Sequence, residues 1–437
     1  MSALEWQEVV RRATFPFLSP PNARQAAFGA ALAVLISHNA YLILGFGFFG
    51  SQGNSVVTGA LLFGLLLLLF LSSFRASFRI QLPDSIFAGF VITAMASLFL
   101  NSEETISTKE HLLLVASLAG YIACRPMLAQ DAAVVRSAFE RITAVIVLVG
   151  TVFTAAEIFS QWDGPPGKPF VFGFNAAGTY FMAALGFLVI ALVTVDEPRP
   201  KRTAVICALI FLPTVVFAAA MVRFTFLALA GSLFVAMIFS GSGKRWHIAA
   251  VGFTIFLAVA IGLSARYETA KLYTSYILER TVEMRASGTA SRRAGGTEAP
   301  SCRLAVNTRN SIAIRQALAR DAIHLIPTAG LVGTGLDSFM SYSCIKAHEV
   351  HISVLQAAVE FGWLGGIFWV LLIGLAVYRL APIAQQTGVA RFILCSLVFA
   401  ILLSFAHGRI SRDGPLFALL GCAVGVCDFR RSNDFQA

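Results

Sequence analysis

The sequence predicts an all-α polytopic membrane protein, and three observations lead to that prediction. The 437 residues are 57% hydrophobic and only 13% charged, and their mean hydropathy is +0.77, which is too apolar for an ordinary soluble domain. The apolar residues form continuous stretches of roughly 17 to 25 residues, about the length that a helix needs to cross the hydrocarbon of a bilayer. These stretches lack the two-residue alternation of a membrane strand, which excludes an outer-membrane barrel.

About twelve such spans follow one another along the chain, so both termini are expected on the same side of the membrane. The expected spans are residues 26–50, 55–74, 85–101, 111–128, 142–160, 172–195, 203–221, 223–241, 247–264, 352–378, 391–407 and 414–428. The apolar stretch from 203 to 241 is too long for one crossing, and we divide it into a hairpin with its turn next to Arg223.

Three regions result from this division. Residues 1–264 hold the predicted transmembrane helices 1–9, residues 265–350 form one large loop, and residues 351–437 hold helices 10–12. The short connections on the side of the termini contain 17 Lys and Arg, against 5 on the other side. Because Lys and Arg are enriched in cytoplasmic loops, both termini are expected in the cytoplasm and the large loop outside. The net charge of +10 reflects this asymmetry and does not indicate nucleic-acid binding.

The outer loop has three predicted parts. Residues 266–285 mix apolar residues with both charge signs, as in a helix that lies along the membrane. Residues 286–301 are small, polar and Gly-rich, which is typical of a flexible tether. Residues 308–326 have the pattern of a second amphipathic helix that ends at Pro327. The arginines on this helix are Arg309, Arg315 and Arg320.

Glycines and cysteines follow in the same loop. Gly330, Gly333 and Gly335 predict a turn rather than a nucleotide-binding loop, because the strand and helix of a dinucleotide fold are missing around them. Cys302 and Cys344 also lie in this loop, where an oxidising exterior favours a disulfide between them, with two free thiols as the alternative.

His351 is the leading candidate for chemistry. It opens the tenth span at the outer membrane surface, three residues after His348, where a partly dry imidazole can accept a proton. A helix-start histidine without a chemical role is the alternative. His348, Glu349 and His351 could be drawn as metal ligands, but no second acidic cluster accompanies them, so neither a metal nor another cofactor is predicted. Glu360 falls one or two turns into the membrane, where a carboxylate needs a partner.

The run from His351 through Leu355, Glu360, Gly362 and Gly365 resembles a known signature. The signature is His-Asn-x-x-Leu…Glu-x-Gly-x-x-Gly, which is typical of the bacterial O-antigen ligase and polymerase superfamily. About twelve spans with one large periplasmic loop before the motif helix are also similar to that family.

Two further segments resemble the same family. The stretch from Arg315 to Gly333-Thr-Gly335 is similar to the family's arginine-started helix and Gly-x-Gly turn, and Arg223 is similar to its basic residue at the start of the eighth span. The resemblance is strongest across residues 203 to 378. It departs from the family at Ile352, where Asn is usual, and this puts the branch of the family in doubt.

The resemblance implies a GT-C-like enzyme of the bacterial inner membrane, surrounded by membrane lipids. Such an enzyme transfers a glycan from undecaprenyl diphosphate to an acceptor hydroxyl at the periplasmic face, without a metal. The acceptor is lipid A-core for a ligase, which we prefer, or a growing polysaccharide for a polymerase. His351 would take the proton of that hydroxyl. The residues expected to bind substrate, mainly through charge on the diphosphate, are Arg223, Arg315, Arg309, Arg320, His348 and Glu360.

A twelve-span transporter or flippase is the alternative from a different functional class. Transporters usually place ionisable residues and broken helices at the middle of the bilayer. The predicted spans are instead nearly free of charge, with His38 the clearest central exception, and the candidate site residues gather at the outer rim. This distribution favours chemistry at the membrane surface.

Overall fold

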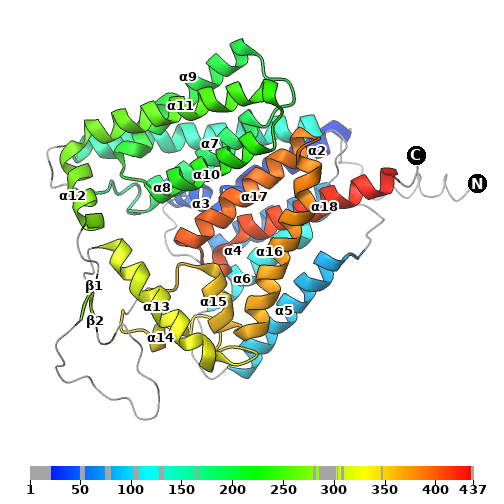
Figure 1. Cartoon of the computed structure of the whole chain (residues 1–437), viewed down its shortest axis with the longest axis vertical. Helices are drawn as coiled ribbons and strands as arrows, with labels where there is room; N and C mark the ends of the chain where they lie inside the picture. Colours follow the sequence, from blue (N-terminus) through cyan, green and yellow to red (C-terminus); the bar gives the residue numbers. More distant parts are fainter. Residues whose placement is uncertain are drawn as a thin grey trace, which may run out of the picture.

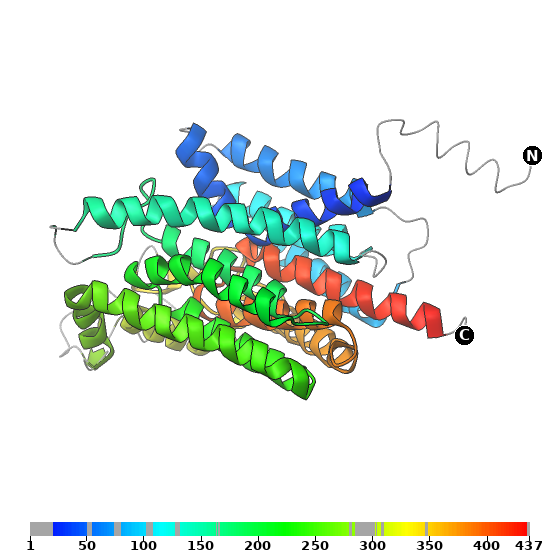
Figure 2. The same ribbon diagram turned by 90° about the horizontal axis from the view of Figure 1, so that it is seen from above.

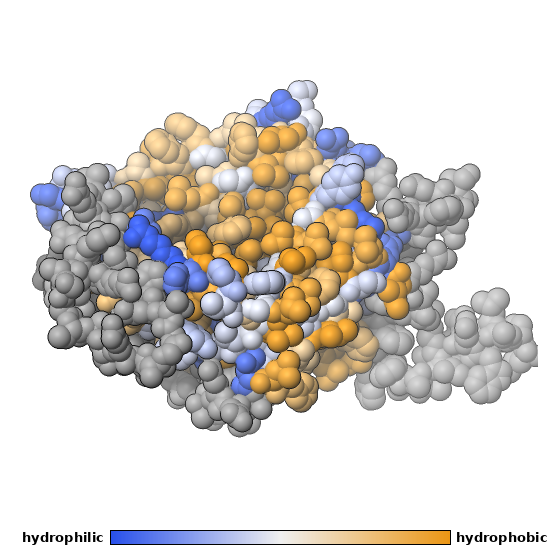
Figure 3. Space-filling view, turned by 60° about the horizontal axis from the view of Figure 1, so that its bottom comes forward, coloured by the Kyte–Doolittle hydropathy of each residue, from blue (hydrophilic) through white to orange (hydrophobic). Residues whose placement is uncertain are grey.

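The described part of the computed structural model forms a bundle of long helices that run side by side (Figures 1 and 2). The described residues are 21–49, 55–73, 80–101, 108–126, 132–162, 164, 167–278, 282–284, 302, 304–306, 310–345 and 348–434. Apolar residues cover much of one face of the molecule (Figure 3). Many large apolar side chains are exposed, and Phe99 is the most exposed phenylalanine of the described residues, at 79%. The protein is therefore an all-α, multi-pass membrane protein, as the sequence predicts.

Apolar helices occur in the order of the predicted spans. They are the pair α2 (Pro21–Ile36) and α3 (His38–Phe49), then α4 (Ser55–Ser73), α5 (Leu82–Leu100), α6 (Thr108–Cys124), α7 (Ala132–Ser160), α8 (Ala177–Val193), α9 (Pro200–Ala219), α10 (Phe224–Ile238), α11 (Ser242–Ala265), α16 (Gly362–Ala384), α17 (Gly388–His407) and α18 (Gly414–Asp434). Among the described residues, six helices are long and apolar enough to cross a membrane, and the bent pair α2–α3 makes up to seven. The other five apolar helices are shorter, so twelve crossings remain a prediction.

Two spans that the sequence predicts as continuous are broken. Helices α2 and α3 meet at Ser37 with a bend of 85°. The predicted span 352–378 consists of the short α15 (Ser353–Glu360) and the membrane-length α16, and its prediction as one helix is wrong. The second break occurs because Gly362 has φ +74°, a left-handed conformation that a continuing α-helix cannot contain.

The hairpin near Arg223 is confirmed. Helix α9 ends at Ala219 and α10 begins at Phe224, with Met221 at φ +60° in the turn between them. Arg223 is the residue immediately before α10.

The elements of the predicted outer loop gather at one end of the bundle, and the C-terminal end of α18 lies at the other (Figure 1). These elements are α12 (Tyr267–Leu278), β1 (Val282–Met284), β2 (Leu304–Val306), α13 (Ser311–Ala329) and α14 (Phe339–Tyr342). The predicted helix 266–285 is too long, because residues 282–284 instead pair antiparallel with β2. The predicted tether 286–301 lies outside the described residues.

Helix α13 begins and ends for identifiable reasons. The Asn310 side chain accepts hydrogen bonds from the backbone N–H groups of Ile312 and Ala313 at 3.0 and 3.4 Å, which caps the first turn. The helix continues through Pro327 to Ala329, so the predicted end at the proline is wrong by two residues. A disulfide joins Cys302 to Cys344 and connects the region of β2 to the chain that leads to His348.

Candidate active site

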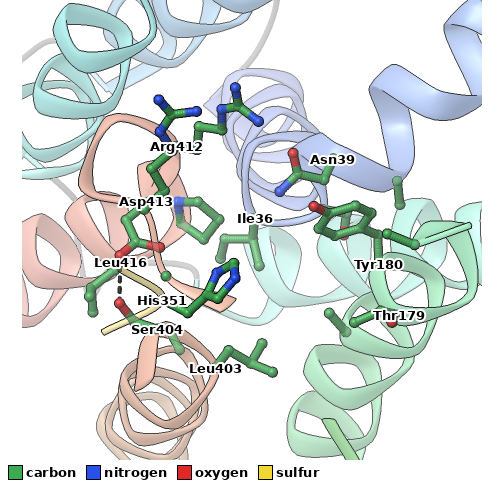
Figure 4. A pocket seen from close by; sticks show the side chains of 18 of the residues that line it. Ile36, Asn39, Thr179, Tyr180, His351, Leu403, Ser404, Arg412, Asp413 and Leu416 are labelled. Atoms are coloured by element: carbon green, nitrogen blue, oxygen red, sulfur yellow. Dashed lines mark hydrogen bonds between the residues drawn. The ribbon is translucent and has the colours of Figure 1, made fainter. Parts of the chain in front are cut away.

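A cavity of about 460 Å³ lies between α2, α3, α8, α17 and α18 and the segment before α15. His348 and His351 both line it. In the close view the His351 ring lies among Asn39 and Tyr180 on one side and Ser404 and Asp413 on the other (Figure 4). The two histidines that the sequence singled out therefore line the same cavity as residues from five helices.

His351 is half-buried and stands one residue before the N-cap of α15. Burial and the positive charges of Arg315, His348 and Arg409 together lower its pKa to about 4, with burial the largest cause. The imidazole is therefore neutral at pH 7, which is the form that accepts a proton. Nearby negative charge would favour protonation, because it would offset the cations that now oppose it.

Arg409 fixes the chain around His351. Its guanidinium forms ion pairs with Glu349, two residues before the histidine, with Asp337 at 2.6 Å and with Glu110 at 3.2 Å. One side chain thus joins α6, the turn after α13 and the segment that carries His351. The three ion pairs link the segment before α15 to the bundle and to the turn after α13.

The acidic residues of this network outnumber the basic ones. Arg412 also pairs with Glu110, at 2.6 Å, and Ser411 donates a hydrogen bond to the same carboxylate at 2.7 Å. Burial raises the pKa of Glu349 to about 7, with Arg409 opposing that effect. Two arginines therefore face three carboxylates, and neither arginine is an isolated positive charge.

A second polar group lies on the cavity wall close to His351. The Ser404 hydroxyl is 2.5 Å from a carboxylate oxygen of Asp413 and 2.7 Å from the hydroxyl of Ser353 at the start of α15. Ser404 and Asp413 both line the cavity. Burial raises the pKa of Asp413 to about 7, against the hydrogen bond from Ser404. This carboxylate can accept a hydrogen bond from a hydroxyl placed in the cavity.

Three cations form a separate cluster near His351, which we call the cationic cluster: Lys168, Arg223 and Arg315. The Arg315 guanidinium lies 4.5 Å from the centre of the Phe224 ring, and Arg223 donates to the backbone carbonyl of Tyr273 at 3.2 Å. These contacts position both planar groups.

Burial lowers the pKa of all three members of the cationic cluster, and repulsion by neighbouring cations contributes at Lys168 and Arg315. The pKa of Lys168 is lowered to about 8, with Arg223 and Arg315 as the charges responsible after burial. The pKa of Arg315 is lowered to about 10, with Arg223 as the charge responsible after burial. A bound anion would relieve this repulsion. None of the three lines the cavity.

The other residues predicted to bind substrate lie elsewhere. Arg320 is exposed on α13, and it does not line the cavity. Glu360 is fully buried, accepts a hydrogen bond from the Gln356 amide at 2.9 Å and also lies outside the cavity lining. Arg309 is outside the described residues.

The glycine motifs have a structural role. The N–H groups of Thr334 and Gly335 donate to the carbonyls of Val359 and Glu360, each at 3.0 Å. Gly333 has φ +80°, and a Cβ there would lie 2.3 Å from the Glu360 carbonyl oxygen. The turn after α13 therefore packs backbone against backbone on the break between α15 and α16. This contact explains why both segments need glycine.

Sequence reasoning found His348, His351, Arg223 and Arg315 but missed the groups that surround them. Those groups are Asn39, Glu110, Asp337, Ser404 and Asp413. No local motif marks them, because each belongs to a different segment. Within the described residues, no group of three or more His, Cys, Asp or Glu side chains is placed to hold a metal ion. No protein-family model matches the chain, and no curated protein matches it.

Proposed function

We propose that the chain is a glycosyltransferase that moves a glycan from undecaprenyl diphosphate to an acceptor hydroxyl. The observation that carries the proposal is the position of the His351 imidazole, on the wall of a cavity and within electrostatic reach of the half-buried Arg315. A proton acceptor beside a set of half-buried cations suits a reaction in which a hydroxyl is deprotonated and a diphosphate leaves.

In the proposed reaction the acceptor oxygen forms a bond to the anomeric carbon of the donor glycan. His351 takes the hydroxyl proton, the bond from that carbon to the phosphate oxygen breaks, and undecaprenyl diphosphate leaves with the electron pair. Arg223 and Arg315 offset its charge, because a guanidinium suits phosphate oxygens. The bound anion in turn raises the pKa of His351, because it stabilises the protonated ring. Binding of the donor therefore makes His351 a stronger base.

The resemblance to the O-antigen ligase superfamily adds the finer proposals. They are a GT-C-like arrangement of twelve spans in the bacterial inner membrane, cytoplasmic termini and a periplasmic site. Lipid A-core is the preferred acceptor, and a growing polysaccharide is the acceptor if the protein is a polymerase. The present site uses the same donor chemistry in either case.

A transporter or flippase is the second candidate function. The bend of 85° between α2 and α3 lies beside the cavity, and broken helices are typical of transporters. We prefer the transferase because the cavity also holds a neutral histidine and polar groups that suit bond formation with a hydroxyl.

Product analysis tests the proposal. Purified protein in nanodiscs would receive an undecaprenyl-diphosphate-linked glycan, with and without lipid A-core. Glycan on lipid A-core indicates a ligase, and longer lipid-linked chains without that acceptor indicate a polymerase. The transferase proposal fails if no glycosidic bond forms with or without lipid A-core while a liposome assay shows that the donor crosses the bilayer.

A further inference from the structure

We propose that the cavity beside His351 binds the sugar of the acceptor, while the diphosphate of the donor binds outside it at the cationic cluster. This inference rests on the proposed function and assigns its two substrates to two different places. It also assigns binding of the acceptor to Asn39, Thr179 and Tyr180.

The charges of the two places differ. The arginines at the cavity, Arg409 and Arg412, are matched by the carboxylates of Glu110, Asp337 and Glu349. Asp413 adds a further carboxyl group to the cavity wall. Two arginines, Arg409 and Arg412, and two carboxyl groups, Glu349 and Asp413, line the cavity, so its wall has no excess of arginines over carboxyl groups to bind a diphosphate.

The cationic cluster has the opposite character. Its three members lie close together, and repulsion between them adds to the effect of burial in lowering the pKa of Lys168 and of Arg315. A polyanion would reduce that repulsion and form charge-assisted hydrogen bonds with the guanidinium groups of Arg223 and Arg315. Because the cluster does not line the cavity, the diphosphate and the acceptor sugar need not compete for space.

The wall of the cavity facing His351 is polar but uncharged. Asn39 at the start of α3 and Tyr180 on α8 point toward the hollow in Figure 4, and Thr179 lines the same wall. An amide, a hydroxyl and a phenol each donate and accept hydrogen bonds, as adjacent hydroxyls of a sugar do. The bend at Ser37 puts Asn39 on this wall, because α3 leaves the direction of α2 there.

The position of His351 joins the two places. It lines the cavity, and Arg315 of the cationic cluster is the charge that most lowers its pKa. A hydroxyl held in the cavity can therefore give its proton to His351 while the anomeric carbon of the donor approaches from the side of the cluster. The cavity volume of about 460 Å³ is within the roughly 300–1,000 Å³ usual for small-molecule sites.

Steady-state kinetics with the full chain in nanodiscs test the assignment. Lipid-linked donor and sugar acceptor are varied separately for Asn39→Ala, Tyr180→Phe and Arg223→Gln. Loss of one neutral hydrogen bond should raise the acceptor KM about three- to tenfold in the first two variants. Their donor KM should change less than about twofold on the same reasoning. Arg223→Gln should raise the donor KM and leave the acceptor KM near its normal value.

Tyr378→Phe is the matched control for Tyr180→Phe, because Tyr378 is 78% exposed on α16 and does not line the cavity. It should change neither constant. The inference is overturned if Asn39→Ala and Tyr180→Phe raise the donor KM and leave the acceptor KM unchanged.

A binding measurement keeps the inference separate from the proposed function. The probe is a phosphate-free core oligosaccharide, detected by saturation-transfer NMR with the wild type and with Asn39→Ala. We expect wild-type binding that Asn39→Ala weakens and that inorganic diphosphate does not displace. If the wild type transfers no glycan, the proposed function fails, and this measurement alone decides the role of the cavity. Absence of wild-type binding, or its displacement by diphosphate, contradicts the inference.

Discussion

Replacement of Gly333 by alanine tests the contact that shapes the start of α16. Gly333 has φ +80°, and a left-handed conformation costs a residue with a Cβ about 1–2 kcal/mol. The new Cβ would also lie 2.3 Å from the Glu360 carbonyl oxygen, and 2.4 Å from the backbone nitrogen of Gly362. Relief of such crowding by backbone movement costs about 1–3 kcal/mol more.

Two other glycines separate these contributions. Gly330 has φ +69° and ψ −163°, a backbone region almost restricted to glycine, but nothing lies within 4 Å of an added Cβ. Gly330→Ala should therefore show a conformational cost of about 1–3 kcal/mol without crowding. Gly374 lies in α16 with open space around it, and Gly374→Ala should stabilise the helix by up to about 1 kcal/mol. Gly333→Ala adds the crowding to its conformational cost, so its total cost of about 2–5 kcal/mol should exceed that of Gly330→Ala.

Unfolding by SDS in mixed micelles, followed by tryptophan fluorescence, measures the three free energies on one scale. The expected order of stability is Gly374→Ala, then Gly330→Ala, then Gly333→Ala. Equal stability of the two turn variants would refute the proposed backbone contact between the turn and the α15–α16 break.

Four further predictions concern the site. The His351→Ala variant should fold normally but form no transfer product. Normal transfer by this variant would show that His351 is not the base. Transfer should be lost as the pH falls through the pKa of His351, about 4 in the free protein, because only the neutral ring accepts a proton. Arg315→Gln should move that acidic limb of the kcat/KM profile to higher pH, since it removes the charge that most lowers this pKa, and an unmoved limb would contradict the coupling. Arg409→Met should lower the free energy of unfolding in the SDS assay by about 3–5 kcal/mol, because it removes the cation of Asp337 and Glu349 and leaves Glu110 with Arg412 alone. A change below about 1 kcal/mol would mean that the network does not stabilise the fold. A chelator should leave transfer unchanged, and a loss reversed by a divalent ion would overturn the metal-free proposal.

Hydropathy was sufficient for much of the fold. The apolar helices fall in the predicted order, and the hairpin before α10 follows from the limited length of one crossing. The amphipathic pattern also predicted α13, on which Arg315 lies, and the placement of two cysteines in one loop predicted the pair that the structure joins. These features depend on local composition and periodicity.

The remaining features depend on contacts between distant segments. The break between α15 and α16 needs the turn at Gly333, and hydropathy alone makes the two helices look continuous. Arg412 and Glu110 are separated by 302 positions in the sequence, so no local pattern indicates that they share an ion pair. The pairing of β1 with β2 likewise crosses a long connection.

The stoichiometry of the products tests the central claim most directly. Wild-type protein in nanodiscs, with a radiolabelled undecaprenyl-diphosphate-linked glycan and acceptor, should form one new glycosidic bond for each undecaprenyl diphosphate released. His351→Ala should do neither while still binding the donor. Release of undecaprenyl diphosphate without a new glycosidic bond, or equal transfer by His351→Ala, would contradict the account of His351 as the base between two substrates.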